Sequence, residues 1–188
     1  QHAFVAVEDE NFYTHPGFSF KRTVLAAINE VFRKLTGSYL TGSQLGASTI
    51  EQQLIKNITG EDESSGIEGY ARKVKEIFVA TEMEKKYSKD QILEFYLNNI
   101  YYGNGYYGIG AAGRGYFDSG VDELDLSQIA FLCAIPNNPS LYDPVNHADH
   151  TITRRDLILK NMLDDGKITQ SAYESAKAEQ IVLNRPQT

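Results

Sequence analysis

The chain has 188 residues, of which 18 are Lys or Arg and 25 are Asp or Glu, so its formal net charge is −7. This acidic balance excludes a non-specific nucleic-acid binder, which needs a basic surface to displace phosphate counterions. A single cysteine, Cys133, excludes a disulfide framework and a cysteine-based zinc site. The longest apolar run, 129–135, is too short to span a membrane, and the length suits one folded domain.

The first half of the chain carries helix signals separated by polar loops. Residues 2–14 predict a helix that places Glu8 on one face with Phe4 and Phe12. A second helix is expected from the Ser19 cap to a stop at Gly37, followed by a loop over 36–46. Capping-box spacing over 48–51 starts the next helix, and an acidic loop over 60–66 precedes a long one. We expect the long helix to turn a set of mostly apolar side chains inward: Ala71, Val74, Ile77, Phe78 and Thr81.

The second half continues this pattern. A capping box over 88–91 opens a helix, and the Tyr- and Gly-rich stretch 101–120 contains at most a short helix at 110–116. A helix over 126–134 ends at Pro136, and further prolines keep the following stretch irregular. The last substantial helix is expected from Thr153 to Gly166, with a short one after Thr169. Strand-like alternation is never sustained, so the sequence predicts one mainly α domain with long Gly/Tyr-rich and Pro-rich loops.

Two adjacent carboxylates, Glu8 and Asp9, lie in an otherwise apolar segment. Because helix neighbours point about 100° apart, one can face inward while the other stays in water. Burial beside Phe4 would make Glu8 a usable proton acceptor or donor. A solvated pair near a helix end is the alternative, and His15 before Pro16 is equally typical of a turn.

The segment 46–57 combines a glycine, two hydroxyl residues at a helix start, and amide and Lys side chains. A helix N-terminus offers free N–H groups to an anion, and Gln53 and Lys56 share a face. This favours a polar, anionic ligand, although a solvated helix face has the same spacing.

Cations gather at three further places. Arg72 and Lys73 surround Glu76, either as an ordinary helix ion pair or as a grip on a diphosphate. Lys85, Lys86 and Lys89 are expected on a solvated surface. Arg154 and Arg155, expected near a helix N-terminus, oppose the dipole preference for anions there, which weakly suggests a role other than helix stability. The stretch 101–107 predicts either a sugar-binding loop or a packed aromatic turn.

The order of these segments resembles the peptidoglycan glycosyltransferases, the transglycosylase domains of class A penicillin-binding proteins and their monofunctional relatives. Residues 8–17 match the pattern E-D-x-x-F-x-x-H-x-G, and residues 46–57 match G-x-S-T-x-x-Q-Q-x-x-K-N. Residues 72–76 match R-K-x-x-E, and residues 89–98 match K-x-x-I-L-E-x-Y-L-N. Residues 154–159 resemble R-R-x-x-V-L, and residues 103–108 resemble G-N-G-x-x-G.

The resemblance implies a lysozyme-like helical fold and an inverting reaction. The family joins lipid II units into glycan strands and releases undecaprenyl diphosphate. Glu8 would be the general base and Glu76 the second catalytic carboxylate, with a separation of roughly 6.5–9.5 Å or somewhat more by analogy with inverting glycosidases. The resemblance also implies a set of substrate-binding residues: Asp9, His15, Ser48, Thr49, Gln52, Gln53, Lys56, Asn57, Arg72, Lys73, Asn98, Arg154 and Arg155.

Partners and location follow from the same resemblance. We expect lipid II, the growing lipid-linked strand, a membrane surface and inhibitors of the moenomycin type as partners, and no nucleic acid. The domain over 1–188 would act on the outer face of the bacterial cytoplasmic membrane, with any anchor or transpeptidase domain outside this chain. No cofactor and no permanent metal are expected, and a divalent cation at the diphosphate is left open. Phe32, Leu35, Tyr39 and Leu40 are candidates for membrane contact.

Some positions depart from the family pattern. Ala47 replaces a second glycine, the 60–69 segment is longer and more acidic than usual, and Glu68 and Gly69 stand where many relatives have a basic residue.

Two other classes of protein stay open for this sequence. A strand-cleaving lytic transglycosylase or muramidase would need one acid and no diphosphate-binding cations, and a non-catalytic glycan-binding domain would have no use for both Glu8 and Glu76.

Overall fold

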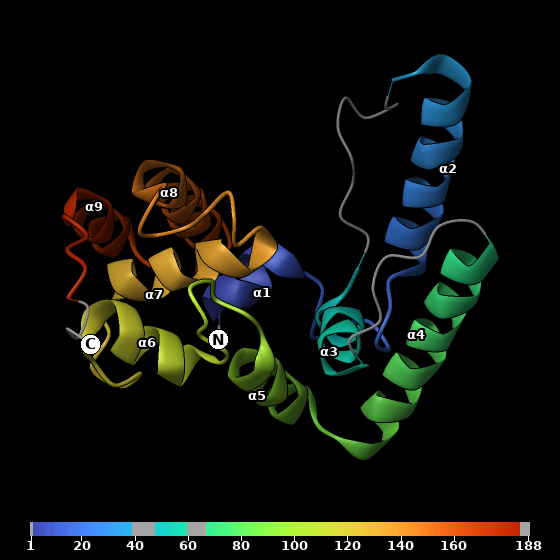
Figure 1. The fold of residues 1–188 in the computed structure, drawn as a ribbon, viewed down its shortest axis with the longest axis horizontal. Helices are drawn as coiled ribbons and strands as arrows, with labels where there is room; N and C mark the ends of the chain where they lie inside the picture. The colour runs from blue at the N-terminus through green and yellow to red at the C-terminus, as the bar shows by residue number, and fades with distance from the viewer. Residues whose placement is uncertain (1, 39–47, 60–66, 185–188) are drawn as a thin grey trace. The chain divides into compact units, whose positions relative to one another are not determined.

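A computed structural model describes residues 2–38, 48–59 and 67–184. Within these ranges the chain forms nine α-helices and one short 3-10 turn (Figure 1). The same ranges contain no strand beyond an isolated bridge between Tyr101 and Tyr107. The prediction of a mainly α fold is therefore confirmed. No helix in these ranges has both the length and the apolar character needed to cross a bilayer. The expectations for Tyr39, Leu40, Gly46, Ala47 and the acidic segment 60–66 fall outside the described residues.

The contacts divide the chain into two compact units. The first unit contains residues 1–10 and 97–188, and the second contains residues 11–96. Helix α5 (Lys89–Asn99) passes from the second unit into the first. The expectation of a single domain over 1–188 stays a prediction.

The first unit is built around α7 (Leu126–Ala134), the most apolar helix of the described chain. It contacts α1 (His2–Glu8), α6 (Ile109–Phe117), α8 (Ala148–Asp164) and α9 (Gln170–Ala178), and it continues into the 3-10 turn η1 (Ile135–Asn137). Figure 1 shows α7 as the middle layer between α6 and α8. Residues 130–135 are fully buried, because a helix covered on several sides needs apolar side chains all round.

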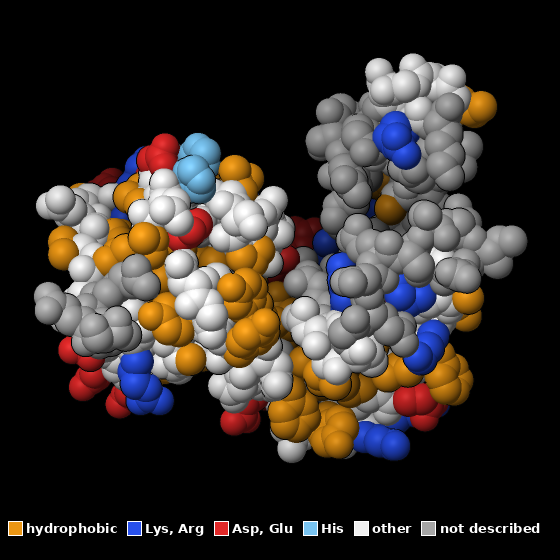
Figure 2. Space-filling model, in the orientation of Figure 1, with side chains coloured by type: hydrophobic (Ala, Val, Ile, Leu, Met, Phe, Trp, Pro, Cys, Tyr) orange, Lys and Arg blue, Asp and Glu red, His pale blue; other side chains and the backbone are white. Residues whose placement is uncertain are grey.

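The second unit contains α2 (Phe20–Thr36), α3 (Ile50–Thr59), α4 (Ile67–Lys86) and most of α5. Most of its buried apolar side chains come from the segment before α2 and from α3 and α5, and they include Phe12, Ile50, Leu54, Ile92, Leu93 and Tyr96. Helices α3 and α4 pack on each other. Figure 2 shows Lys and Arg side chains beside exposed hydrophobic ones on the visible face of this unit.

Local capping explains several of the described helix ends. The Ser19 hydroxyl accepts from the Arg22 amide at the start of α2, and the predicted stop is confirmed because Gly37 takes a left-handed φ of 77°. The second predicted capping box is confirmed by reciprocal Ser88 and Gln91 bonds, and α7 has the predicted bounds. Helix α9 starts after the predicted Thr169 cap.

Three expectations were wrong in part. Helix α1 ends at Glu8, because the next turn is held by the Asn11 carbonyl, which accepts from the amides of Thr14 and His15. Helix α8 starts five residues before Thr153, after a His147 that makes no side-chain cap. On α4, Val74 and Phe78 are 67% and 66% exposed, while Glu76 and Ala80 are buried, so the inward face is opposite to the one predicted.

Candidate active site

Glu8 lies at the end of α1 in the first unit and is 9% exposed. Its Oε1 accepts from Nη2 of Arg154 on α8 at 3.3 Å. The Arg154 guanidinium also lies over the ring of Tyr142, 5.2 Å from the ring centroid. Sequence reasoning missed Tyr142, which belongs to none of the motifs.

Asp9, the next residue, is 1% exposed, and its amide donates to the Val5 carbonyl at 3.1 Å. The alternative of a solvated carboxylate pair is therefore wrong, since both side chains are withdrawn from water. Both had also been expected to share one long helix with Phe12. Phe12 instead belongs to the second unit, where its ring meets His15 edge-on at 6.3 Å. The turn interpretation of the His15 backbone is confirmed.

The start of α3 is capped one residue later than predicted. The Thr49 hydroxyl accepts from the Gln52 amide, and the Gln52 side chain accepts from the Thr49 amide, so the capping box is Thr49–Gln52 and not Ser48–Glu51. Thr49 also donates to the Gly17 carbonyl at 2.8 Å. Both side chains are buried in this cap, which gives them a structural role at the N-terminus of α3.

Gly17, the last residue of the first motif, has a structural reason to be glycine. Its φ is +83°, and a Cβ there would lie 2.8 Å from the Ala80 carbonyl oxygen on α4. The motif therefore brings the backbone before α2 into direct contact with α4.

Because Thr49 supplies the cap, the Ser48 side chain is available to α4. Lys73 Nζ donates to Ser48 Oγ at 3.1 Å and to Glu76 Oε2 at 2.6 Å. Arg72 Nη1 bonds the other carboxylate oxygen, Oε1. The Glu76 side chain is only 4% exposed, so this buried carboxylate holds two cations in place. We call Ser48, Arg72, Lys73 and Glu76 the α4 cluster.

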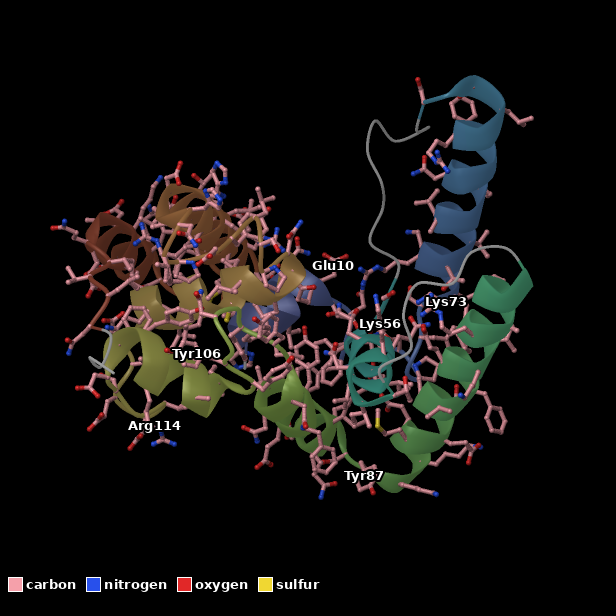
Figure 3. All side chains as sticks on the ribbon, viewed as in Figure 1. Glu10, Lys56, Lys73, Tyr87, Tyr106 and Arg114 are labelled. Carbon is pink, nitrogen blue, oxygen red and sulfur yellow. The ribbon has the colours of Figure 1, made fainter. Side chains whose placement is uncertain are left out.

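The remaining candidates of α3 lie on its polar side. Tyr96 donates its hydroxyl to Gln53 Oε1 at 3.0 Å, so Gln53 is fixed by α5. Lys56 is partly exposed and Asn57 is exposed. Figure 3 labels Lys56 on α3 and Lys73 on α4, two helices that pack together.

Lys89 is not on a solvated surface, contrary to expectation. Its ammonium pairs with Glu51 at 2.8 Å and Glu84 at 2.6 Å and lies 4.4 Å from the centre of the Phe12 ring. Burial raises the pKa of Glu84, and its hydrogen bond to Glu51 acts in the same direction. Lys89, the first residue of the fourth motif, is therefore partly buried and links α5 to carboxylates on α3 and α4.

The Tyr- and Gly-rich stretch forms a packed aromatic loop. Tyr116 donates to the Tyr102 carbonyl at 2.8 Å and accepts from Asn104 Nδ2 at 3.0 Å. Burial raises the pKa of Tyr116 to about 12. The Tyr106 ring lies so close to Gly115 that a Cβ there would be 2.2 Å from it. The structure therefore supports the packing alternative for most of this loop, while Tyr107 is exposed.

Arg155 requires a correction. Its guanidinium donates to Asp156, Ser127 and the carbonyls of Lys177 and Glu179, and these bonds use all five N–H groups. No donor is left for a diphosphate, and the residue is 3% exposed. The dipole argument also fails, because α8 begins at Ala148 and places both arginines beyond its first turn. Arg155 braces α7, α8 and the end of α9.

The candidate residues therefore divide between the units. Glu8, Asp9, Asn98, Arg154 and Arg155 belong to the first, and all the others, Glu76 included, belong to the second. The expected separation of Glu8 and Glu76 stays a prediction. Within the second unit, His15 and Glu51 bring donor atoms within 4.8 Å of each other, and Glu51 also pairs with Lys89.

Comparisons with known proteins agree with the motif order. The transglycosylase family model matches residues 1–163. The chain is 41% identical over 181 residues to penicillin-binding protein 4 of Bacillus subtilis, covering 96% of this chain and 27% of that protein. It is 38% identical over 183 residues to penicillin-binding protein 1A of Escherichia coli, covering 97% of this chain and 20% of that protein.

A solved structure gives the same result. Penicillin-binding protein 1A from Haemophilus influenzae matches with a TM-score of 0.51 and 29% identity, over 73% of this chain and 17% of that one. The chain thus spans about a quarter or less of the length of these relatives. The chain belongs to the transglycosylase family, the family of glycosyltransferase domains found in class A penicillin-binding proteins.

Proposed function

We propose that this domain polymerises lipid II into peptidoglycan glycan strands by inverting glycosyl transfer, with release of undecaprenyl diphosphate. The α4 cluster is the observation that carries the proposal. A buried carboxylate that fixes an Arg and a Lys beside a serine hydroxyl suits a phosphate-bearing ligand, because Arg offers paired donors and Lys a point charge. A strand-cleaving enzyme has no use for such a cluster.

The proposed role of each residue follows from the chemistry of the leaving group. Diphosphate is a good leaving group, so charge stabilisation and positioning matter more than acid catalysis. Glu8 removes the proton from the acceptor 4-hydroxyl as its oxygen attacks C1 of the donor sugar. Arg72, Lys73 and Lys56 offset the charge on the departing diphosphate. Glu76 positions two of these cations.

The other candidates support these groups. Thr49 and Gln52 hold the start of α3, Gln53 is oriented by Tyr96, and Asn57, Asn98, Asp9 and His15 stay predicted contacts of the sugar or phosphate. We further propose that the domain acts at the outer face of the cytoplasmic membrane, where a lipid-linked substrate and strand are held, and that it binds moenomycin-type inhibitors without a required cofactor.

The test is polymerisation of purified lipid II by the wild-type chain and by Glu8→Gln. The matched control is Glu10→Gln, which changes an exposed carboxylate two residues away (Figure 3). We expect strands from the wild type and the control and none from Glu8→Gln, with similar melting temperatures. Free disaccharide released from finished peptidoglycan would instead identify a hydrolase.

A second experiment addresses the cations. Lys56→Ala and Lys73→Ala should each weaken binding of a moenomycin-type diphosphate mimic, whereas Lys86→Ala, which removes an exposed lysine at the end of α4, should not. Equal affinities for all three variants would remove Lys56 and Lys73 from the phosphate site.

A further inference from the structure

We propose that Arg154, held against the ring of Tyr142, is the positioning residue of Glu8. The inference rests on the proposed function, in which Glu8 is the general base. It assigns Arg154 to the base itself and not to the substrate, which the family resemblance implied that Arg154 binds.

The contact joins two elements far apart in the sequence. Glu8 ends α1, and Arg154 lies on α8, which packs against α1. The two side chains are 7% and 15% exposed, so little water screens the pair. The Nη2–Oε1 distance of 3.3 Å lies within hydrogen-bonding range, so the guanidinium donates to one defined oxygen of the carboxylate.

The neighbouring arginine fixes the rotation of α8. Successive helix residues point about 100° apart, so Arg154 and Arg155 cannot face the same ligand. Arg155 is locked by bonds to Ser127 and to two carbonyls at the end of α9. These bonds of Arg155 hold α8 in one orientation, and that orientation determines the direction in which the Arg154 side chain leaves the helix.

Tyr142 contacts the guanidinium of Arg154 through its ring. The Tyr142 amide donates to the Asn138 carbonyl at 2.9 Å. The next residue, Asp143, accepts from Asn104 and from the Val145 amide, both at 2.9 Å. The ring is therefore held by its own loop and by the 101–108 loop, and it lies 5.2 Å from the Arg154 guanidinium, within cation–π range.

The positive charge in contact with Glu8 comes from Arg154, whose guanidinium pairs with Oε1 of the carboxylate. The position of this guanidinium therefore determines where Oε1 of Glu8 points.

The test separates kcat from KM in lipid II polymerisation. Because displacement of a catalytic group by about 1 Å can cost about 100-fold, we expect Arg154→Ala to lower kcat about 10- to 100-fold with KM changed less than about twofold. Arg154→Lys, which keeps the charge and loses the planar fork, should recover part of the loss. Arg114→Ala removes an exposed arginine of the same unit and should match the wild type (Figure 3).

Tyr142 provides a second, independent variant. Tyr142→Phe keeps the ring and should keep kcat, whereas Tyr142→Ala should lower kcat by about 3- to 10-fold, less than loss of Arg154 itself. In an Arg154→Ala background, Tyr142→Ala should cause no further fall, because the ring acts through the guanidinium. Melting temperatures of all variants identify any that lose activity by unfolding.

The outcomes are distinguishable. An active wild type with an equally active Arg154→Ala overturns this inference and leaves the proposed function intact. A raised KM with an unchanged kcat also overturns it, in favour of a direct substrate contact. Independent effects of Tyr142→Ala and Arg154→Ala refute the role of the ring. A wild type that makes no strands from lipid II refutes the proposed function, and the assignment to Glu8 falls with it.

Discussion

Replacement of Arg155 by alanine tests whether this residue of the fifth motif stabilises the fold and does not bind the diphosphate. The substitution removes a buried guanidinium whose five donors are all used. It leaves the hydroxyl of Ser127 and the carbonyls of Lys177 and Glu179 without their partner. We expect a large loss of stability and no specific loss of ligand affinity.

The magnitude follows from these contacts. A hydrogen bond to a charged group contributes about 1.5–3 kcal/mol, and breaking a buried charged network typically costs about 3–5 kcal/mol. The bonds to Asp156 count for less, because its side chain is 30% exposed and water can replace them. The other three bonds, one buried and two partly buried, therefore predict a loss of about 3–5 kcal/mol, or about 6–20 °C in melting temperature for a chain of this length.

Urea unfolding and thermal melting of Arg155→Ala, Arg155→Lys and the surface control Arg114→Ala provide the measurement. Lysine should retain part of the stability, because an ammonium can reach some but not all of these acceptors. If Arg155→Ala kept wild-type stability but bound a diphosphate inhibitor more weakly, the structural role of Arg155 would be refuted. A role of Arg155 in phosphate binding would then be supported.

Three further predictions concern the first unit. Tyr116, with its pKa raised by burial to about 12 from 10.0, stays protonated in the fold while the unfolded chain ionises. Wild-type stability should therefore fall between pH 10 and 12, by up to about 2.7 kcal/mol from this residue, and urea titrations of Tyr116→Phe should show a smaller fall. Cys133 should not react with an aromatic disulfide reagent in the native protein and should react fully in denaturant, since it is buried and its thiol pKa is raised. Gly108→Ala should cost about 2–4 kcal/mol in urea unfolding, because φ is +81° and the new Cβ would lie 2.5 Å from the Asn98 carbonyl oxygen; a neutral result would mean that the 101–108 loop can move away.

Helix positions with strong local signals could be predicted from the sequence. The bounds of α7 follow from Asp125, which forms a capping box, and from the proline that ends the helix. The start of α8 could not be predicted, because His147 makes no side-chain cap and leaves no compositional signal. The end of α1 was missed because apolar spacing continues past Glu8, while the backbone turns at Asn11.

The orientation of α4 shows a different limit. Helical periodicity places Val74 and Phe78 inward on the rule that apolar faces are buried. The structure instead buries Glu76, since Arg72 and Lys73 supply the charge that makes burial of a carboxylate tolerable. A pattern of apolar residues cannot reveal a buried ion cluster whose members are also spaced at three and four residues.

The candidate site was found through motif order more than through spacing. Motifs identify which residues matter but not where each one points. The fifth motif placed Arg154 and Arg155 together among the substrate-binding residues, yet Arg154 contacts Glu8 and all the donors of Arg155 bond the protein itself. Tyr142 lies outside every motif, so only the folded arrangement relates it to Arg154.

The α4 cluster has a consequence for the cost of binding. Free Arg and Lys side chains each carry about 2 kcal/mol of rotamer entropy, which a ligand must normally remove when it immobilises them. Here Glu76 has already ordered both, and one carboxylate against two cations leaves an excess charge of +1. An incoming anion therefore meets cations that are preorganised by the protein's own carboxylate, and more of the electrostatic attraction is retained as affinity.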